Sequence, residues 1–236
     1  MKKNVLFGVL FALLFPFVTS CLREGGQKIS MGNYPGVAIR RNDSIKIYLK
    51  GNDVVYSPRI SSNVENEDCV IIDFVLDYDL PENSDSGRIK GFLTVDISNV
   101  RFVPRHDLKT GLTDTAVILP GEHTIASVQQ RNAFILNRFF LFTEHSADTL
   151  PLRFELSYDP QQVTTDKVYD LFLRVTKIME SPSAPQLKTQ YNAFNFTELT
   201  NRETDSLIFR INYARAFNRD STQIDWTATP IYRFAL

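Results

Sequence analysis

The sequence predicts an all-β protein, and two observations support this prediction. From residue 37 onward apolar and polar residues alternate with a period of two, most clearly in Ser44–Lys50 and Leu207–Tyr213. Turn-forming residues, as in Gly51–Asp53 and Leu119–Gly121, separate these short runs. Many short strands with regular turns are typical of β-barrels and β-sandwiches.

The first residues have the pattern of a bacterial lipoprotein signal. Two lysines precede the apolar run Val5–Val18, and small residues stand directly before Cys21. A run this short, with basic residues in front, is typical of a secretory signal rather than of a membrane-spanning helix. We therefore expect residues 1–20 to be a signal peptide and Cys21 to carry lipid that anchors the protein in the outer membrane. The sequence leaves open whether the protein faces the cell surface or the periplasm.

The chain after the signal divides into two halves. Residues 21–35 are polar with little periodicity, so we expect a flexible tether. The alternating runs fall into residues 36–105 and 126–236, which we expect to be two β domains joined by a linker over 106–125. Residues 167–178 combine near-helical apolar spacing with high strand propensity, so strand and helix both stay open there.

Composition limits the possible partners. Hydrophobic residues make up 43% of the chain, which supports a packed core rather than disorder. The net charge of −1 and the predicted export argue against a nucleic-acid partner. Only two cysteines are present, so a lipidated Cys21 leaves Cys69 without a disulfide partner. Cys69 begins an apolar run, and we expect a buried, unreactive thiol.

The sequence contains no recognisable catalytic or metal-binding motif. The three histidines lack the spacing of zinc ligands, and we expect them in loops or strand ends at the surface: His106, His123 and His145. The densest group of oxygen ligands could bind calcium, but no glycine provides the required sharp turn. A solvated hairpin tip is the favoured interpretation of this group, which comprises Asp77, Asp79, Glu82, Asn83 and Asp85. We expect no catalytic residue, cofactor or metal.

Three weaker patterns bear on function. Asp73 and Asp77 fall on one strand face and could serve a hydrolase, although such carboxylates usually face solvent. Trp226 is the only tryptophan and could stack on a sugar, although a tryptophan near a strand end more often packs at the core margin. Five triplets resemble an envelope O-glycosylation sequon, although turns that lead into strands produce the same letters; they begin at Asp43, Asp114, Asp148, Asp205 and Asp220.

The layout resembles the NigD-like lipoproteins of Gram-negative anaerobes. Asn66–Phe74 looks like the polar turn and central strand of that family, and Phe92–Pro104 looks like the strand that closes its first domain. Ala133–Phe142 and Leu152–Asp159 look like early strands of its second domain. The resemblance implies an OB-like N-terminal barrel followed by a C-terminal β-sandwich. The family has no established biochemical activity, so the resemblance implies no reaction.

The expected function is that of a lipid-anchored cell-envelope protein that is not an enzyme. We expect it to bind a protein or glycan partner through its β surface. The alternative is a structural anchor or assembly factor for a surface appendage such as a fimbria, because such proteins add strands across exposed sheet edges. A hydrolase that uses Asp73 and Asp77 ranks last.

Overall fold

The structure is a computed structural model that describes residues 28–42, 44–50, 53–60, 63–83, 91–135, 138–148, 152–163, 167–178, 187–203 and 205–235. The predicted signal peptide and Cys21 lie outside these residues. Nearly all of the described secondary structure is β-strand, which confirms the predicted fold class. Among the described residues, no helix is both long enough and apolar enough to cross a membrane.

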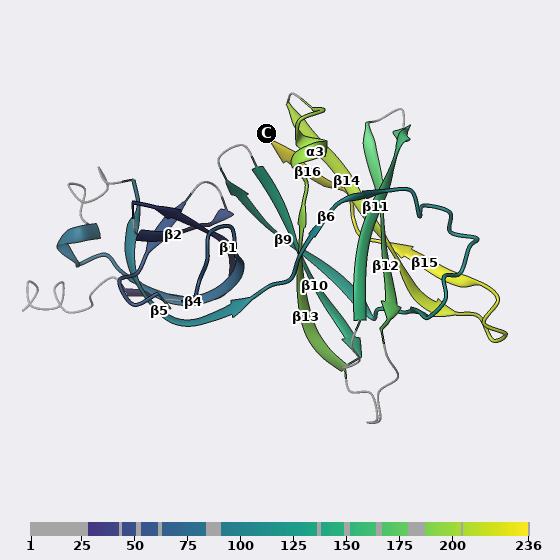
Figure 1. Cartoon of the computed structure of the whole chain (residues 1–236), viewed down its shortest axis with the longest axis horizontal. Helices are drawn as coiled ribbons and strands as arrows, with labels where there is room; N and C mark the ends of the chain where they lie inside the picture. The colour runs from purple at the N-terminus through teal and green to yellow at the C-terminus, as the bar shows by residue number, and fades with distance from the viewer. Residues whose placement is uncertain are drawn as a thin grey trace, which may run out of the picture.

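The N-terminal part of the described chain is a closed barrel, drawn in colours from purple to teal in Figure 1. Its strands are β1 (Lys28–Arg41), β2 (Ser44–Tyr48), β3 (Val54–Tyr56), β4 (Cys69–Asp77) and β5 (Leu93–Phe102). The hydrogen-bonded order is β1-β2-β3-β5-β4, with β4 returning to β1 and with β3 parallel to β5. This is the five-stranded barrel of the OB type that the resemblance implies for this half.

Strand β1 begins within the tether expected over residues 21–35, which corrects that boundary. Residues 28–35 pair with β4 and belong to the barrel. A register shift between Met31 and Tyr34 marks a β-bulge, where Asn33 has a φ of 55°. Glycine and asparagine are depleted in regular strands but suit bulges, and this explains why the strand was hidden in the sequence.

The interior of the barrel is filled by apolar side chains that alternate along its strands. The buried members are Ile47, Leu49, Val55, Val70, Ile72, Phe74, Leu76 and Val95. Gly36 allows β1 to approach this core closely, because a Cβ atom at this position would lie 2.4 Å from Cγ2 of Ile47. Any larger residue at this position would have to displace the neighbouring strand.

The second half of the chain forms two sheets. A four-stranded sheet has the order β6-β13-β10-β9, made of β6 (Arg105–Asp107), β13 (Leu187–Asn195), β10 (Arg138–Asp148) and β9 (Ser127–Ile135). The larger sheet has the order β15-β14-β12-β11-β7, made of β15 (Ile224–Ala228), β14 (Ser206–Phe217), β12 (Val168–Lys177), β11 (Leu152–Val163) and β7 (Lys109–Thr110). Two short strands complete it, β8 (Glu122–His123) beside β12 and β16 (Tyr232–Ala235) beside β14. The segment left open between strand and helix is therefore a strand, β12.

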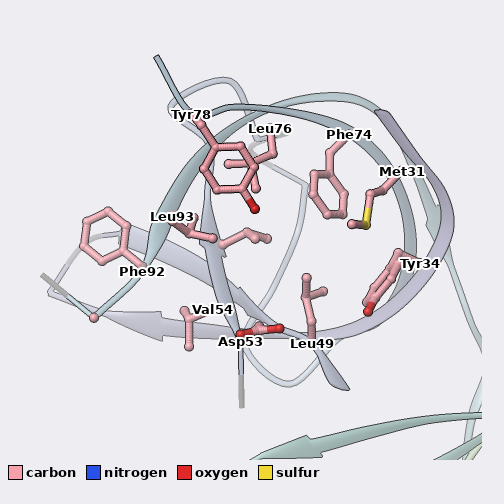
Figure 2. Close-up of a pocket in the computed structure, with 12 residues that line it drawn as sticks. Met31, Tyr34, Leu49, Asp53, Val54, Phe74, Leu76, Tyr78, Phe92 and Leu93 are labelled. Carbon is pink, nitrogen blue, oxygen red and sulfur yellow. The ribbon is translucent and has the colours of Figure 1, made fainter. Parts of the chain in front are cut away.

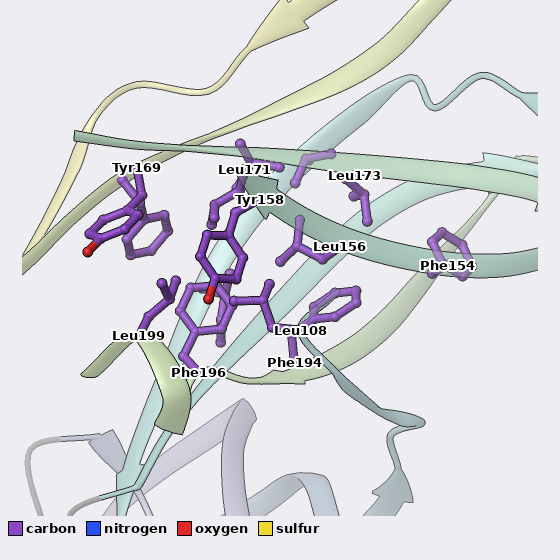
Figure 3. Packing of buried hydrophobic residues seen from close by; sticks show 14 of the residues in the cluster. Leu108, Phe154, Leu156, Tyr158, Tyr169, Leu171, Leu173, Phe194, Phe196 and Leu199 are labelled. Atoms are coloured by element: carbon purple, nitrogen blue, oxygen red, sulfur yellow. The ribbon is translucent and has the colours of Figure 1, made fainter. Parts of the chain in front are cut away.

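The two sheets pack on one hydrophobic core, as a β-sandwich does. Phe139 and Leu141 enter it from β10, and Leu156 and Leu171 enter it from β11 and β12. Figure 3 shows the apolar side chains of both sheets meeting in this layer. The short helix α3 (Thr197–Thr200) adds Leu199, which is fully buried.

The segment 106–125 is part of the sandwich, which corrects its interpretation as a linker. Strands β6, β7 and β8 within or beside it pair with β13, β11 and β12. Arg174 of β12 is 2% exposed and donates to the carbonyl oxygens of Leu112, at 2.9 Å, and Val117, at 3.0 Å. Its guanidinium also pairs with the buried carboxylate of Glu122 at 2.7 Å. Because buried charges need such partners, these bonds fix the segment on the sheet.

The barrel is docked on the outer face of the four-stranded sheet, as Figure 1 shows. Buried apolar side chains of both parts share this interface: Val37, Tyr48, Cys69, Ile71, Val103, Phe140, Phe142 and Ala193. The backbone at residues 103–104, where the chain passes from the barrel to the sandwich, is held by hydrogen bonds on both sides. The N–H of Val103 donates to the carbonyl oxygen of Cys69, and the N–H of Ala193 donates to the carbonyl oxygen of Pro104, each at 2.9 Å. The two parts therefore share a continuous buried interface.

Strand β11 forms an edge of the larger sheet along its first half. Strand β7 pairs with β11 at Ser157 and Tyr158. Among the described residues, no strand pairs with residues 152–156 on that side. Such unpaired edges are places where a sheet can be extended.

Candidate functional site

The main candidate site is a hollow of about 440 Å³ at one end of the barrel, shown in Figure 2. The strands of the barrel and the ends of its turns contribute the lining residues Met31, Tyr34, Leu49, Asp53, Val54, Val55, Phe74, Leu76, Tyr78, Gly91, Phe92 and Leu93. Four of these, Leu49, Val55, Phe74 and Leu76, also belong to the barrel core. The hollow is therefore an opening into the core, and its volume is in the range of small-molecule and side-chain pockets.

Aromatic rings form much of the wall of this hollow. Tyr34 packs edge-on against Phe74, with ring centroids 6.0 Å apart, and Tyr56 packs edge-on against Phe92 at 5.5 Å. The ammonium of Lys46 lies 4.1 Å from the centroid of the Phe92 ring, a cation–π contact. These contacts hold the rings in place before any ligand binds, which lowers the entropy cost of binding.

A few polar groups border the apolar wall. Figure 2 shows Asp53 on one lip, with Tyr78 on the opposite side and Tyr34 beside Leu49. Asp53 is exposed, and among the described lining residues it is the only one with a formal charge at neutral pH. An apolar cavity with a small number of polar groups at its rim is the usual form of a ligand site.

Asp73, one of the two carboxylates considered for hydrolysis, stabilises the barrel wall. Its Oδ1 accepts the backbone N–H of Asn33 at 2.6 Å, and its Oδ2 accepts the side-chain amide of Asn99 at 3.0 Å. These bonds hold the pKa of Asp73 below its ordinary value. Asp77 pairs instead with Lys28 at 3.1 Å, and this hydrogen-bonded contact lowers the pKa of Asp77. Both carboxylates therefore stay ionised near neutral pH, which does not suit a general acid.

Hydrogen bonds of the Asn83 side chain hold the acidic turn after β4 together. The side-chain amide of Asn83 donates to the carbonyl oxygens of Asp77, at 2.8 Å, and Thr94, at 2.7 Å, and its Oδ1 accepts the N–H of Thr94. The N–H of Asp79 donates to Oδ1 of Asp77 at 3.0 Å. In the part of the chain that the structure describes, no three His, Cys, Asp or Glu residues form a metal-binding group. Asp85 lies outside the described residues.

The prediction that all three histidines lie at the surface is wrong for His145. It is 1% exposed in β10 and its ring stacks on Phe154, with centroids 4.4 Å apart. The side-chain amide nitrogen of Asn192 lies 2.8 Å from its Nε2, and the amide oxygen lies 2.7 Å from Nε2 of His106. Burial lowers the pKa of His145 to about 3, so its ring is neutral at physiological pH. Its Nδ1 has no hydrogen-bond partner among the described residues.

Trp226 packs against the protein, as the core-margin alternative predicts. Its Nε1–H donates to the carbonyl oxygen of Thr115 at 3.2 Å. The ring of Phe172 meets it edge-on with centroids 6.0 Å apart, and the guanidinium of Arg174 lies 5.0 Å from its centroid. These contacts hold the half-exposed ring against the sandwich and give no support of their own to sugar stacking at this residue.

Cys69 is buried at the interface between barrel and sandwich. It is 2% exposed, and burial raises the pKa of its thiol to about 12. The thiol is therefore protonated at neutral pH, which confirms the expectation of a small buried hydrophobe. A protonated, inaccessible thiol is a poor nucleophile.

Sequence reasoning missed the hollow at the barrel end. Its residues come from five separate segments, and only the closed barrel brings them together. The available signal was aromatic residues just outside strand ends, namely Tyr78 after β4 and Phe92 before β5, together with Tyr34 beside the bulge of β1. Tyr34 was hidden further because it fell within the expected tether.

The barrel defines the class of this part of the protein. Residues 26–101 match the family model of the lipoprotein OB domain. These residues cover the barrel, from just before β1 almost to the end of β5. The N-terminal half is therefore similar in sequence as well as in topology to OB domains of lipoproteins.

Several solved structures share the architecture of most of the chain, barrel and sandwich together. An uncharacterised protein from Parabacteroides merdae has a TM-score of 0.73 at 21% identity, covering 88% of this chain and 98% of that one. A protein described as a lipoprotein, from Bacteroides fragilis, has a TM-score of 0.57 at 8% identity, covering 89% and 97%. A NigD-like immunity protein from Bacteroides caccae has a TM-score of 0.51 at 9% identity, covering 87% and 96%. At these identities the likeness concerns the fold, and no curated protein matches this chain.

Proposed function

We propose that this protein is a lipid-anchored component of the bacterial cell envelope that binds a protein or glycan partner at the end of its OB-like barrel. The observation that carries the proposal is the hollow of about 440 Å³, with its fixed aromatic wall and polar rim. OB barrels commonly bind oligosaccharides or other chains through one side and its loops. The match of residues 26–101 to a lipoprotein domain supports the envelope location.

The proposal includes no catalysed reaction. The side chains first considered for chemistry have structural roles: Asp73 bonds to the bulged strand, His145 is buried and neutral, and Cys69 is a buried thiol with a raised pKa. A catalytic site needs groups that converge on a substrate with suitable protonation states. Binding is the function that the geometry of the hollow supports best.

Anchoring through Cys21 is tested by fractionating host cells. A Cys21→Ala variant is expected to leave the membrane fraction for the soluble fraction, because the acylated thiol is lost. Protease treatment of intact cells, with a periplasmic protein as control, then distinguishes the cell surface from the periplasm. A Cys21→Ala protein that has lost residues 1–20, as checked by intact mass, and still stays with the membrane would contradict lipid anchoring at this residue.

Partner binding is tested by placing a photo-cross-linking phenylalanine analogue at Phe92 in host cells. We expect a discrete cross-linked protein from this position and none from Ile231, which is 57% exposed on the sandwich and serves as the control. A glycan array probed with the mature protein covers the other partner class, with Tyr78→Ala as the variant that should lose binding. Equal cross-linking from both positions, with array binding unaffected by Tyr78→Ala, would contradict the barrel end as the site.

A further inference from the structure

We propose that the free edge of β11 receives an extended peptide segment of another protein, which carries a carboxylate side chain opposite Arg153. The inference is independent of the barrel-end site, because it concerns the other half of the molecule. It would give the structural-anchor role, expected above as the alternative, a defined point of attachment.

The backbone of β11 presents unpaired groups at this edge. The N–H of Gly111 donates to the carbonyl oxygen of Tyr158 at 3.2 Å, which shows that the backbone groups of Tyr158 point toward β7. Groups of alternate residues in a strand point to the same side, so the N–H and C=O of Phe154 point to this edge as well. Strand β7 is only two residues long and lies opposite Ser157 and Tyr158. Within the described chain, nothing pairs with the outward backbone groups of Phe154.

The edge is rigid although its backbone is unpaired. The side chain of Phe154 is 4% exposed and belongs to the sandwich core, where it stacks on His145. On its other side β11 is paired with β12 from Leu152 to Tyr158 without a register shift. A peptide that adds here therefore meets a fixed template and does not have to order it, which favours strand addition.

Space for such a peptide lies directly beside the edge. A hollow of about 520 Å³ is lined by His106, Asp107, Lys109, Arg153, Phe154 and Glu155. These residues come from β6, β7 and β11, so the hollow is where the edges of the two sheets meet. Natural proteins usually cover such an edge, whereas here β7 covers only the end of the free segment.

The charges around the hollow determine what it selects. Lys109 pairs with Glu155, and Asp107 accepts the side-chain amide of Asn195 at 3.4 Å. Arg153 is exposed and has no ion-pair or hydrogen-bond partner among the described residues. Among the described residues that line the hollow, Arg153 is therefore the one cation without a carboxylate partner, and a carboxylate binds guanidinium with two parallel hydrogen bonds. An extended segment with one acidic side chain in register satisfies both the backbone and this charge.

The experiment uses the mature protein and two synthetic probes. One is a seven-residue peptide of alternating threonine and valine with a central glutamate, and the other has glutamine at the centre. Amide hydrogen exchange followed by NMR reports on Phe154, whose N–H should exchange rapidly in the free protein despite its buried side chain. We expect the glutamate peptide to slow this exchange at least tenfold and to bind at least tenfold more tightly than the glutamine peptide.

Charge variants test the role of Arg153. The Arg153→Glu variant should lose the preference for the glutamate peptide, whereas Arg219→Glu, a charge reversal in an exposed turn far along the chain, should keep it. Protection of the Phe154 amide in the free protein, or failure of both peptides to slow its exchange, would overturn the proposal. Equal binding of the two peptides would overturn the proposal that the edge selects a carboxylate. Self-association of the protein through β11 would show instead that a second copy of this chain occupies the edge. None of these results bears on cross-linking from the barrel end.

Discussion

The thiol of Cys69 is expected to report whether the barrel stays docked on the sandwich. It lies in their interface, 2% exposed, and burial raises its pKa from 9.0 to about 12. At pH 8 the thiolate fraction is then about 10⁻⁴, compared with about 10⁻¹ for a thiol with the ordinary value, since each pKa unit is a factor of ten. Only the thiolate attacks a disulfide reagent, so labelling of the native protein should be at least about 10³ times slower than labelling of the unfolded chain.

Truncating one ring of the interface should accelerate this labelling. Phe140 is 3% exposed and packs in the same cluster as Cys69. Replacing a buried phenylalanine with alanine costs about 3–5 kcal/mol, and each 1.4 kcal/mol is a factor of ten in population. In the Phe140→Ala variant the open state of the interface, and with it the labelling rate, should therefore increase about 10²- to 4 × 10³-fold. The adjacent Phe139→Ala is the matched control, because this ring points into the sandwich core instead.

The assay follows absorbance after adding a chromogenic disulfide reagent to a chain that begins at Leu22, in which Cys69 is the only thiol. Urea unfolding of each variant measures its overall stability in parallel. Labelling of the native wild-type protein as fast as that of the unfolded chain would refute the buried interface. If Phe139→Ala and Phe140→Ala accelerate the labelling of Cys69 equally, at equal loss of stability in urea, the interface does not open independently of global unfolding.

Three further predictions concern other residues. Arg174→Met should cost about 3–5 kcal/mol in urea unfolding because it leaves the carboxylate of Glu122 buried without its cationic partner, with the backbone N–H of Leu119 still donating to it. Adding Glu122→Leu should restore most of the loss, and a double variant no better than the single one would contradict this account. The pKa of Asp73 is lowered in the folded state, so its ionised form stabilises the protein above the ordinary value of 3.8 and this contribution is lost as pH falls through the folded-state pKa. The stability gap between wild type and Asp73→Asn should therefore close on acidification, and a gap that widens would count against the bonds described. Finally, if the triplet at Asp220 is a glycosylation site, the exposed Ser221 should carry sugar in the native host, and an intact mass equal to that of the bare chain would exclude it.

The sequence predicted strands well where the alternation of apolar and polar residues within the strand is sufficient to identify it. The alternation in Ser44–Lys50 and Leu207–Tyr213 corresponds to β2 and β14, because a period of two follows directly from strand geometry. The segment 168–177 was ambiguous because it is buried on both faces, which blurs the alternation. Strand pairing on each side decided between strand and helix.

Features that depend on distant partners could not be predicted in this way. The segment 106–125 has no periodicity of its own, and its order comes from Arg174, which lies 52 residues beyond Glu122. The burial of His145 depends on Asn192 and Phe154, which only sheet pairing and sandwich packing bring beside it. Isolated polar residues of this kind look exposed in a sequence until their partners are known.

The start of β1 limits how far the folded protein can stand from a lipid at Cys21. Lys28 follows Cys21 by seven residues, and an extended chain spans at most about 3.6 Å per residue, so the barrel would lie within about 25 Å of the acylated residue. A tether that reached residue 35 would have doubled this distance. An acylated form would thus move in a thin layer at the bilayer surface, where neighbours that diffuse in the same plane are met far more often than molecules from the bulk.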